Sequence, residues 1–293
     1  MTQHFHGLGD KIAMEQNEKI ARMILSSARV AKRRSLAADL LKGTVTAMEL
    51  IRSPGECDKY GVDGLDPAKS STDKDLKWLE MFGGDYIVLG DPRYPRRLLR
   101  MGTPPFCLRW QGMLPMGGCL AVVGSRAATR RTMANASNFA AVVSDRGYHV
   151  ISGGAYGIDA AAHRGSLSVN SGTTAFLGSG LGTPYPQRHI PLFGEIIAAG
   201  GGVVSLHHHE FLPFPGAFIE RNRVMAALAD AVIVVAANLK SGALHTAKAA
   251  IQMGTPLFFF PGTPGCDSLA SARGTALCEP DAIIDELAKI GHP

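Results

Sequence analysis

Short polar turns follow several apolar runs in the second half of the chain, and their residue types favour anion binding. The first turn consists of Gly124, Ser125 and Arg126, and Thr129 stands where it can cap the helix that follows. Backbone N–H groups at such a helix start attract anions, and the planar guanidinium of arginine matches the oxygens of a phosphate. The turn therefore indicates a phosphate site, although a tight turn with an exposed arginine would have the same sequence.

A second turn is richer in glycine and leads into another predicted helix. Gly153, Gly154 and Gly157 precede Asp159, so the backbone can approach a ligand closely at a helix start. His163 lies four residues after Asp159, on the same helix face. Such a pair can act in acid–base catalysis, but more often it forms a local hydrogen bond that positions a loop. We favour the loop.

A third turn contains Gly178, Gly180 and Gly182, which raises the question of a dinucleotide cofactor. The spacing is GxGxG rather than GxGxxG, prolines follow where the helix should begin, and no acidic residue stands near the end of the next strand. No nicotinamide, flavin or other cofactor is therefore expected. The next polar residues, Gln187, Arg188 and His189, stand at a helix start and suit phosphate better than a hydride acceptor.

Two later segments add further cations. Arg221, Asn222 and Arg223 lie on a predicted helix, where they fit a phosphate or a base edge. The alternative is a structural network with Glu220 or Asp230. The turn after the fifth apolar run repeats the design of a strand, a turn and a helix start, with Lys240, Ser241 and Gly242.

Metal binding and catalysis have weaker support. Neighbouring side chains of an extended segment point to opposite faces, so only His207 and His209 of a three-histidine run can share an ion. We interpret that run as a solvated polar loop. The five cysteines form no CxxC pair and indicate a reducing compartment. No GxSxG, HExxH or GxxxxGK[ST] motif occurs, and neither a catalytic residue nor a metal ligand is predicted.

Alternating apolar runs and helical segments must position these turns. The runs are short and continuous, which is typical of strands covered on both faces of a parallel sheet. The expected fold class is α/β, a doubly wound, mostly parallel Rossmann-like sheet with a small N-terminal helical unit. Ligands bind outside the carboxyl ends of the strands in such a sheet. The runs begin at Tyr86, Phe106, Leu120, His149, Thr174, Gly202, Ala231 and Pro256, with helices expected at 127–146, 158–169, 190–199, 217–229 and 242–253.

Three regions are expected along the chain. Residues 1–52 form an N-terminal helical unit, with helices at 11–27 and 29–41, where apolar residues recur every three or four positions. Residues 53–78 are rich in Gly, Pro, Ser and Asp and are interpreted as a linker. Residues 79–293 form the Rossmann-like domain, which includes a last helix at 281–290.

The composition argues against a disordered, fibrous or membrane-spanning chain. Hydrophobic residues make up 46% and charged residues 19%, as in globular proteins. No apolar run reaches the roughly 18 residues needed to cross a bilayer, and the amino terminus has no apolar signal segment. A cytoplasmic protein without membrane contact is expected. The formal net charge is only +5, but eight arginines and no acidic residue occur between Pro92 and Ser144, which favours a polyanionic partner.

The order of these turns resembles that of the bacterial DNA-processing protein family known as DprA or Smf. The resemblance covers roughly residues 80–285 and depends on the motifs in combination, because each alone is weak. YPRRLLRMGTPPFCLRWQG also resembles the lead-in to the family's Rossmann core. The matching segments of the sheet region are AVVGSR, ISGGAYGIDAAAHRGSL, FLGSGLGTPYPQRH, FIERNRVMAAL, VIVVAANLKSGALHTAKAA and FFPGTPG.

The resemblance implies a domain that binds single-stranded DNA in a basic pocket, forms a homodimer and helps to load the recombinase RecA onto incoming strands in natural transformation. It assigns the pocket to the residues that match the family motifs. A carboxy-terminal winged-helix domain, which some members carry, is expected to be absent, because the chain ends at Pro293. The matching positions are Gly124, Ser125 and Arg126, the stretch from Gly153 to His163, Gln187 or Arg188, and Arg221, Asn222 and Arg223.

Four positions depart from the family pattern. Tyr156 stands where an arginine usually precedes GID, and Leu206 stands where a glutamate follows Ser205. Lys240 replaces the arginine of an RSG turn. The family's late GTN motif is replaced by Gly265, Cys266 and Asp267. A divergent member with a changed ligand preference fits these departures.

Two classes of function are compared. In the first, Arg126, Arg188, Arg221, Arg223 and Lys240 line a pocket for the phosphates and a base of single-stranded DNA. In the second, the chain acts like the nucleotide phosphoribohydrolases of a related fold, whose PGGxGT segment is followed by a glutamate. This chain has PGTPG without that glutamate, so binding is preferred and no enzyme activity is expected.

The expected homodimer contact lies within residues 239–261. The last predicted strand carries three successive phenylalanines, and an uncovered apolar edge of a sheet requires a partner. The alternative is that the helix at 281–290 covers this strand within one chain.

Overall fold

The computed structural model describes residues 16–64, 71–115, 118–277 and 282–289. Within these ranges the chain divides into two compact units. The first unit contains residues up to 73 together with 87–94 and 103–107. The second unit contains 74–86, 95–102 and the rest of the chain from 108 onward.

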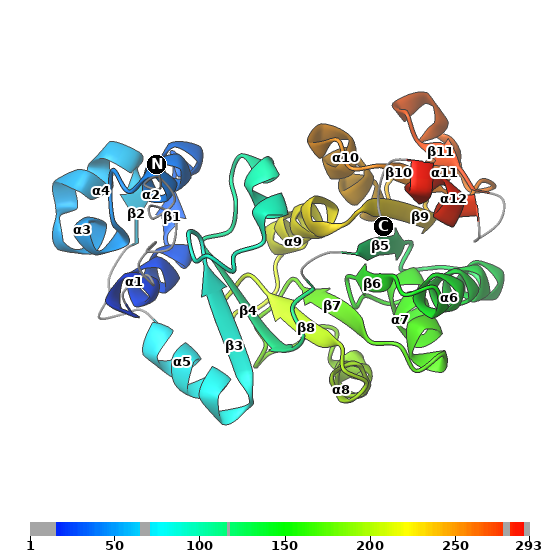
Figure 1. The fold of residues 1–293 in the computed structure, drawn as a ribbon, viewed down its shortest axis with the longest axis horizontal. Helices are drawn as coiled ribbons and strands as arrows, with labels where there is room; N and C mark the ends of the chain where they lie inside the picture. The colour runs from blue at the N-terminus through cyan, green and yellow to red at the C-terminus, as the bar shows by residue number, and fades with distance from the viewer. Residues whose placement is uncertain (1–15, 65–70, 116–117, 278–281, 290–293) are drawn as a thin grey trace, which may run out of the picture. The chain divides into compact units, whose positions relative to one another are not determined.

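The described part of the first unit consists mainly of four helices and a small antiparallel sheet (Figure 1). Glu18 joins two of the helices, because its carboxylate accepts hydrogen bonds from the N–H groups of Ala47 at 2.9 Å and Met48 at 3.1 Å. Thr46 and Glu49 complete a capping box at the same helix start. The elements are α1 Gln16–Ser26, β1 Arg29–Val30, α2 Arg33–Lys42, α3 Ala47–Arg52, α4 Pro54–Tyr60 and β2 Val62–Asp63.

The range predicted to be an irregular linker, 53–78, contains regular structure. It holds α4, β2 and the beginning of α5 (Thr72–Met81), and β2 pairs with β1. Start and stop signals for α4 are present in the sequence, with proline at the helix start and Gly61 in the left-handed conformation at its end. The secondary structure predicted for this range was therefore wrong, because the Gly-, Pro-, Ser- and Asp-rich composition and the lack of an apolar period were given more weight than these signals. The range remains a predicted boundary between domains.

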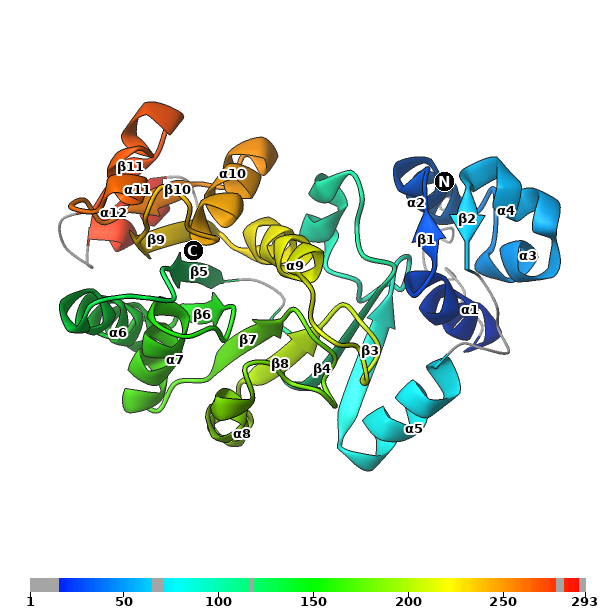
Figure 2. The ribbon, with the colours of Figure 1, turned by 180° about the vertical axis from the view of Figure 1, so that it is seen from behind.

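The second unit contains most of a nine-stranded sheet (Figures 1 and 2). Its strand order is β11-β10-β9-β5-β6-β7-β8-β4-β3, parallel from β11 to β8, while β4 pairs with β8 in the antiparallel sense. The predicted doubly wound α/β fold is confirmed. The strands are β3 Gly84–Val88, β4 Cys107–Gly112, β5 Cys119–Gly124, β6 His149–Ser152, β7 Thr173–Leu177, β8 Gly202–Ser205, β9 Ala231–Ala236, β10 Leu257–Phe259 and β11 Thr275–Ala276.

Helices cover both faces of this sheet. Figures 1 and 2 show α6 and α7 on one side and α9 and α10 on the other. No helix in the described ranges is long and apolar enough to cross a bilayer. The elements are α6 Arg130–Asp145, α7 Ile158–Ser168, α8 Ile190–Ala198, α9 Pro215–Leu228, α10 Ala243–Met253, α11 Pro264–Asp267 and α12 Ala282–Lys289, with 3-10 turns η2 Arg96–Met101, η3 Gln187–His189 and η4 Ala270–Ala272.

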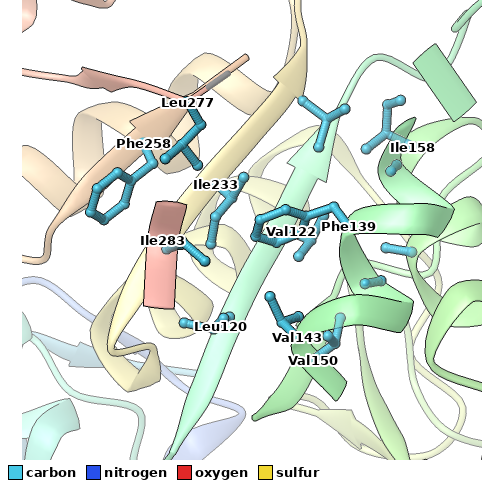
Figure 3. Packing of buried hydrophobic residues seen from close by; sticks show 14 of the residues in the cluster. Leu120, Val122, Phe139, Val143, Val150, Ile158, Ile233, Phe258, Leu277 and Ile283 are labelled. Carbon is cyan, nitrogen blue, oxygen red and sulfur yellow. The ribbon is translucent and has the colours of Figure 1, made fainter. Parts of the chain in front are cut away.

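The main core lies between the sheet and the face that carries α6 and α7. Leu120 and Val122 of β5 and Ile233 of β9 pack with Phe139 of α6, and all four are fully buried (Figure 3). Burial of one such side chain contributes about 1.5–3 kcal/mol. This core fixes the carboxyl ends of the strands, from which the polar turns extend.

Strand β10 is not an uncovered edge. It lies between β9 and β11, and Phe258 and Phe259 are buried. Ile283 of α12 belongs to the same core cluster as Phe258 (Figure 3). The apolar edge predicted within 239–261 was therefore wrong, and the alternative of coverage within the chain is correct. The covering strand has only two residues, Thr275 and Ala276, too few to show an apolar pattern.

Candidate functional site

The turns at the carboxyl ends of β5 to β9 enclose a cavity of about 750 Å³ in the second unit. Cavities of this size accommodate small ligands up to the dimensions of a nucleotide. Each turn contributes at least one side chain to the wall. The cavity brings together nine of the residues predicted from the sequence, which are Gly124, Ser125, Arg126, Asp159, Arg221, Asn222, Lys240, Ser241 and Gly242.

Arg126 presents its charge from the turn after β5. Backbone bonds hold this turn, from Ser125 N–H to the Ala236 carbonyl at 2.7 Å and from Ile158 N–H to the Ser125 carbonyl at 3.2 Å. The predicted cap of α6 is confirmed, because the Thr129 side chain accepts from a backbone N–H of the first turn. The exposed guanidinium of Arg126 lies 5.1 Å from the centre of the Phe218 ring, a cation–π contact.

Arg221 and Asp159 form the buried polar part of the cavity. Arg221 Nη1 donates to the Phe176 carbonyl at 2.6 Å, while Asp159 accepts from the Ala155 N–H at 3.4 Å. Both side chains approach Gly153 so closely that a Cβ there would overlap with them, which explains the glycine. Burial lowers the pKa of Arg221 to about 10 and raises the pKa of Asp159, while each charge opposes the shift of the other. Arg221 therefore remains charged at neutral pH.

The start of α10 forms the opposite wall. Asn222 Nδ2 donates to the Gly242 carbonyl at 3.4 Å, and Ser241 Oγ accepts from Ala243 N–H at 3.4 Å. Lys240 is exposed at the rim. The predicted arrangement of a strand, a turn and a helix start is confirmed here, and it adds a cation and a helix N-terminus to the cavity.

Seven predicted site residues do not line the cavity. Gly153 lines a narrower neighbouring cleft, and Gly154 accepts a hydrogen bond from His189 Nδ1 at 2.8 Å. Gly157 is the N-cap residue before α7 and has a φ of 75°, a conformation that glycine adopts without strain. The other four are His163, Gln187, Arg188 and Arg223.

Three of these four residues are close in sequence to residues that line the cavity, but they do not line it themselves. Gln187 and Arg188 are exposed on the 3-10 turn η3. Arg223 is partly buried and donates through Nη2 to the Met101 carbonyl at 3.4 Å. The sequence predicted these three residues as part of the pocket, and the structure places them outside the cavity wall.

His163 does not pair with Asp159. It is fully buried, and its Nδ1 lies 2.9 Å from Thr173 Oγ1. Because that hydroxyl donates to the Val150 carbonyl at 2.6 Å, it accepts from His163 Nδ1–H. Nε2 is left without a hydrogen-bond partner. Burial lowers the pKa of His163 to about 3, so it belongs to the protein interior rather than to the site.

Sequence reasoning missed the aromatic part of the wall. Tyr185, Phe214 and Phe218 line the cavity, and the first two are more than 40% exposed. Interleaved aromatic and basic residues were the available signal, since Phe214 and Phe218 stand just before Arg221. The other missed lining residues are Val123, Ala127, Ala155, Pro213, Pro215, Ile219, Asn238, Ala243, His245 and Thr246.

The three-histidine run is not a solvated loop. Asp75, which is fully buried, accepts from the His209 backbone N–H at 2.8 Å and pairs with Arg109 Nε. His209 is 8% exposed and stacks on Trp78 with ring centres 5.8 Å apart. Within the described residues, no group of three potential ligands is placed to hold a metal. The run is therefore anchored by a carboxylate that lies more than a hundred residues away in the sequence.

This histidine loop, residues 207–211, is bonded to the glycine turn that precedes Tyr185. Gly180 N–H donates to the Phe211 carbonyl at 2.8 Å, and Gly182 N–H donates to the His209 carbonyl at 2.9 Å. Thr183 Oγ1 donates to the Phe211 carbonyl at 2.8 Å. The two loops together hold the Tyr185 side of the cavity.

The arginine-rich stretch between Pro92 and Ser144 does not form one basic surface. Arg97 pairs with Asp230, and Arg109 pairs with Asp75. Arg100 Nη2 donates to the Ala227 carbonyl at 2.6 Å. Arg97 and Arg109 are therefore paired with carboxylates within the fold, whereas Arg126 lines the cavity.

The fold and the site define a Rossmann-like α/β protein with a cationic, aromatic-lined cavity at the carboxyl ends of its strands. The family described as DNA recombination-mediator protein A matches residues 85–288, and the chain belongs to this family.

Relatives and solved structures agree with this assignment. The chain is 34% identical over 227 residues to protein Smf of Escherichia coli K12, covering 75% of this chain and 61% of that protein. It is 38% identical over 178 residues to a putative DNA processing protein DprA of Mycobacterium tuberculosis H37Rv, covering 59% of this chain and 46% of that protein. The chain thus spans less than two thirds of the length of these relatives.

Two solved DprA structures are similar to this one. The X-ray structure from Streptococcus pneumoniae has a TM-score of 0.75 at 24% identity and covers 93% of this chain and 98% of that chain. A Helicobacter pylori structure, which concerns the single-stranded DNA binding mode of that protein, has a TM-score of 0.63 at 27% identity. It covers 71% of this chain and 98% of that chain.

Proposed function

We propose that this chain binds single-stranded DNA, protects incoming strands and helps to load RecA in natural transformation and recombination. We propose a cytoplasmic homodimer rather than an enzyme. The observation that carries the proposal is the cavity in which Arg126, Arg221 and Lys240 surround exposed aromatic rings. The dimer and the RecA partner rest on the family resemblance alone.

The chemistry of the wall supports a single strand in particular. Cations at the rim suit a phosphate backbone, and aromatic rings stack on bases without regard to their sequence. A base must be unpaired and unstacked before it can lie on Tyr185 or Phe214. A duplex offers only its phosphates to such a site.

The residues that line the cavity support binding rather than hydrolysis of a nucleotide. Hydrolysis of a glycosidic bond commonly uses two carboxylates. Among the described residues that line the cavity, Asp159 is the only carboxylate, and it faces the buried Arg221. The phosphoribohydrolase-like alternative therefore has less support than binding.

The first test compares single-stranded and double-stranded oligonucleotides of one sequence by fluorescence anisotropy at two salt concentrations. We expect single strands to bind at least about ten-fold more tightly at moderate salt, because only they offer bases for stacking. Affinity should fall as salt rises, since phosphate contacts release counterions. Equal affinity for both forms would contradict the proposal.

Arg126→Ala is expected to weaken single-strand binding by about 1–3 kcal/mol, because it removes a charge-assisted contact at the cavity wall without changing the core. The matched control is Arg164→Ala, which removes an equal charge from an exposed position on α7 outside the cavity lining. Titration by anisotropy measures both variants. A lower melting temperature with unchanged binding would show that Arg126 is structural.

A further inference from the structure

A narrow cleft adjoins the large cavity and shares part of its wall. Arg126, Tyr185 and Phe218 line both, while Tyr156 and Pro186 line only the cleft. The cleft encloses about 20 Å³, which is room for about one water molecule. A nucleobase therefore cannot enter it, but a base can lie across its mouth against an exposed ring.

Tyr156 offers such a ring, which is 41% exposed and packs against one neighbouring ring. It makes an edge-to-face contact with His189, with ring centres 4.7 Å apart and an interplanar angle of 71°. His189 is buried, donates from Nδ1 to the Gly154 carbonyl, and packs in turn on Phe193. A single edge-to-face contact covers at most one face of the Tyr156 ring, and its exposure leaves aromatic surface available to a ligand.

We propose that Tyr156 is the stacking platform for the base that neighbours the phosphate held at Arg126. The proposal rests on the proposed function and adds a base-binding subsite to it. Tyr156 and Tyr185, both more than 40% exposed, line one cleft together with Arg126 and Phe218, and the Arg126 guanidinium lies 5.1 Å from the centre of the Phe218 ring. A strand whose phosphate contacts Arg126 therefore brings its next base to an aromatic surface. The Tyr156 side chain offers an aromatic face, which stacks on a base, so it suits the base rather than a phosphate.

Three substitutions separate stacking from other roles of Tyr156. Tyr156→Phe keeps the ring and should bind single strands within about two-fold of the wild type. Tyr156→Leu removes the ring and should weaken binding about 5- to 100-fold. Tyr156→Arg should steepen the salt dependence by about 0.7 in log K per log of salt, because it exchanges a base contact for a phosphate contact.

The probes are oligothymidylate of about 12 nucleotides and an abasic backbone of the same length, which keeps the phosphates and lacks the bases. Tyr156→Leu should weaken binding of the first probe and leave binding of the second unchanged. A 2-aminopurine placed at successive positions should be quenched at one position by the wild type and by Tyr156→Phe, and not by Tyr156→Leu.

Each contrary result has a distinct meaning. Equal losses for both probes, or a Tyr156→Phe variant as weak as Tyr156→Leu, would assign the residue to phosphate through its hydroxyl and overturn the proposal. Wild-type affinity of Tyr156→Leu for oligothymidylate would overturn it as well. In each case the wild type still binds the strand, whereas failure of the wild type to bind would reject the proposed function itself.

Discussion

Replacing Asp75 with alanine should lower the free energy of unfolding by about 3–5 kcal/mol. The Asp75 carboxylate pairs with Arg109, which is 1% exposed, and accepts from the His209 backbone. Its removal takes the Asp75 charge away from the buried guanidinium and the acceptor away from the His209 N–H. Chemical denaturation followed by circular dichroism measures the loss.

Two further variants make this result specific. Glu80→Ala changes an exposed carboxylate on the same helix, α5, and should alter stability by no more than about 0.5 kcal/mol. A double variant, Asp75→Leu with Arg109→Met, should cost less than the two single changes added together, because it leaves no buried charge unpaired. Strict additivity of the two losses would show that the pair is not coupled.

Acidification from about pH 7.5 to pH 5 should remove about 4 kcal/mol of folding stability through two histidines. Burial lowers the pKa of His149 to about 4 and of His163 to about 3, from an ordinary value of 6.5. Below pH 6.5 the unfolded chain binds two protons that the folded chain does not. The stability is therefore complete above pH 6.5 and is lost as pH falls toward the two folded-state values, at up to about 1.4 kcal/mol per histidine per pH unit.

The unpartnered Nε2 of His163 makes this residue the natural one to replace. Protonation there creates a buried N–H without an acceptor. Urea unfolding of His163→Gln over the same pH range measures the free energy of unfolding. The pH dependence of this free energy should correspond to about one proton fewer than in the wild type. An unchanged dependence in His163→Gln would assign the acid sensitivity to other groups.

The sheet was predictable because its strands are buried on both faces. Runs such as Leu120–Val123 and Ala231–Ala236 are continuous in apolar residues, and the structure places strands there within a few residues. Short elements were missed, since neither a two-residue strand such as β11 nor a six-residue helix such as α3 is long enough to establish a period. In α4, the signals in the sequence are instead the proline at the helix start and Gly61 at the helix end.

The site was predictable in position but not in detail. The rule that ligands bind at the carboxyl ends of strands brought Arg126, Arg221 and Lys240 together. The sequence did not show in which direction each side chain leaves the helix. Side chains two residues apart point in directions that differ by about 200° around the helix axis. Arg221 therefore points into the cavity while Arg223 contacts the Met101 carbonyl. The role of the histidine run was not predictable either, since its anchor lies 134 positions earlier in the chain.

The hydrogen bonds between the glycine turn and the histidine loop bear on how a strand would move through the cavity. The Tyr185 side cannot move away from the histidine loop unless the bonds from Gly180, Gly182 and Thr183 break, and that loop is itself bonded to the buried Asp75. Adjustment to different bases is therefore expected from rotation of exposed side chains such as Phe214, on a picosecond to nanosecond timescale, rather than from slower loop displacement. A sliding strand would meet a wall that is already in place. The pace of each step would then be set by the unstacking of DNA bases and not by rearrangement of the protein.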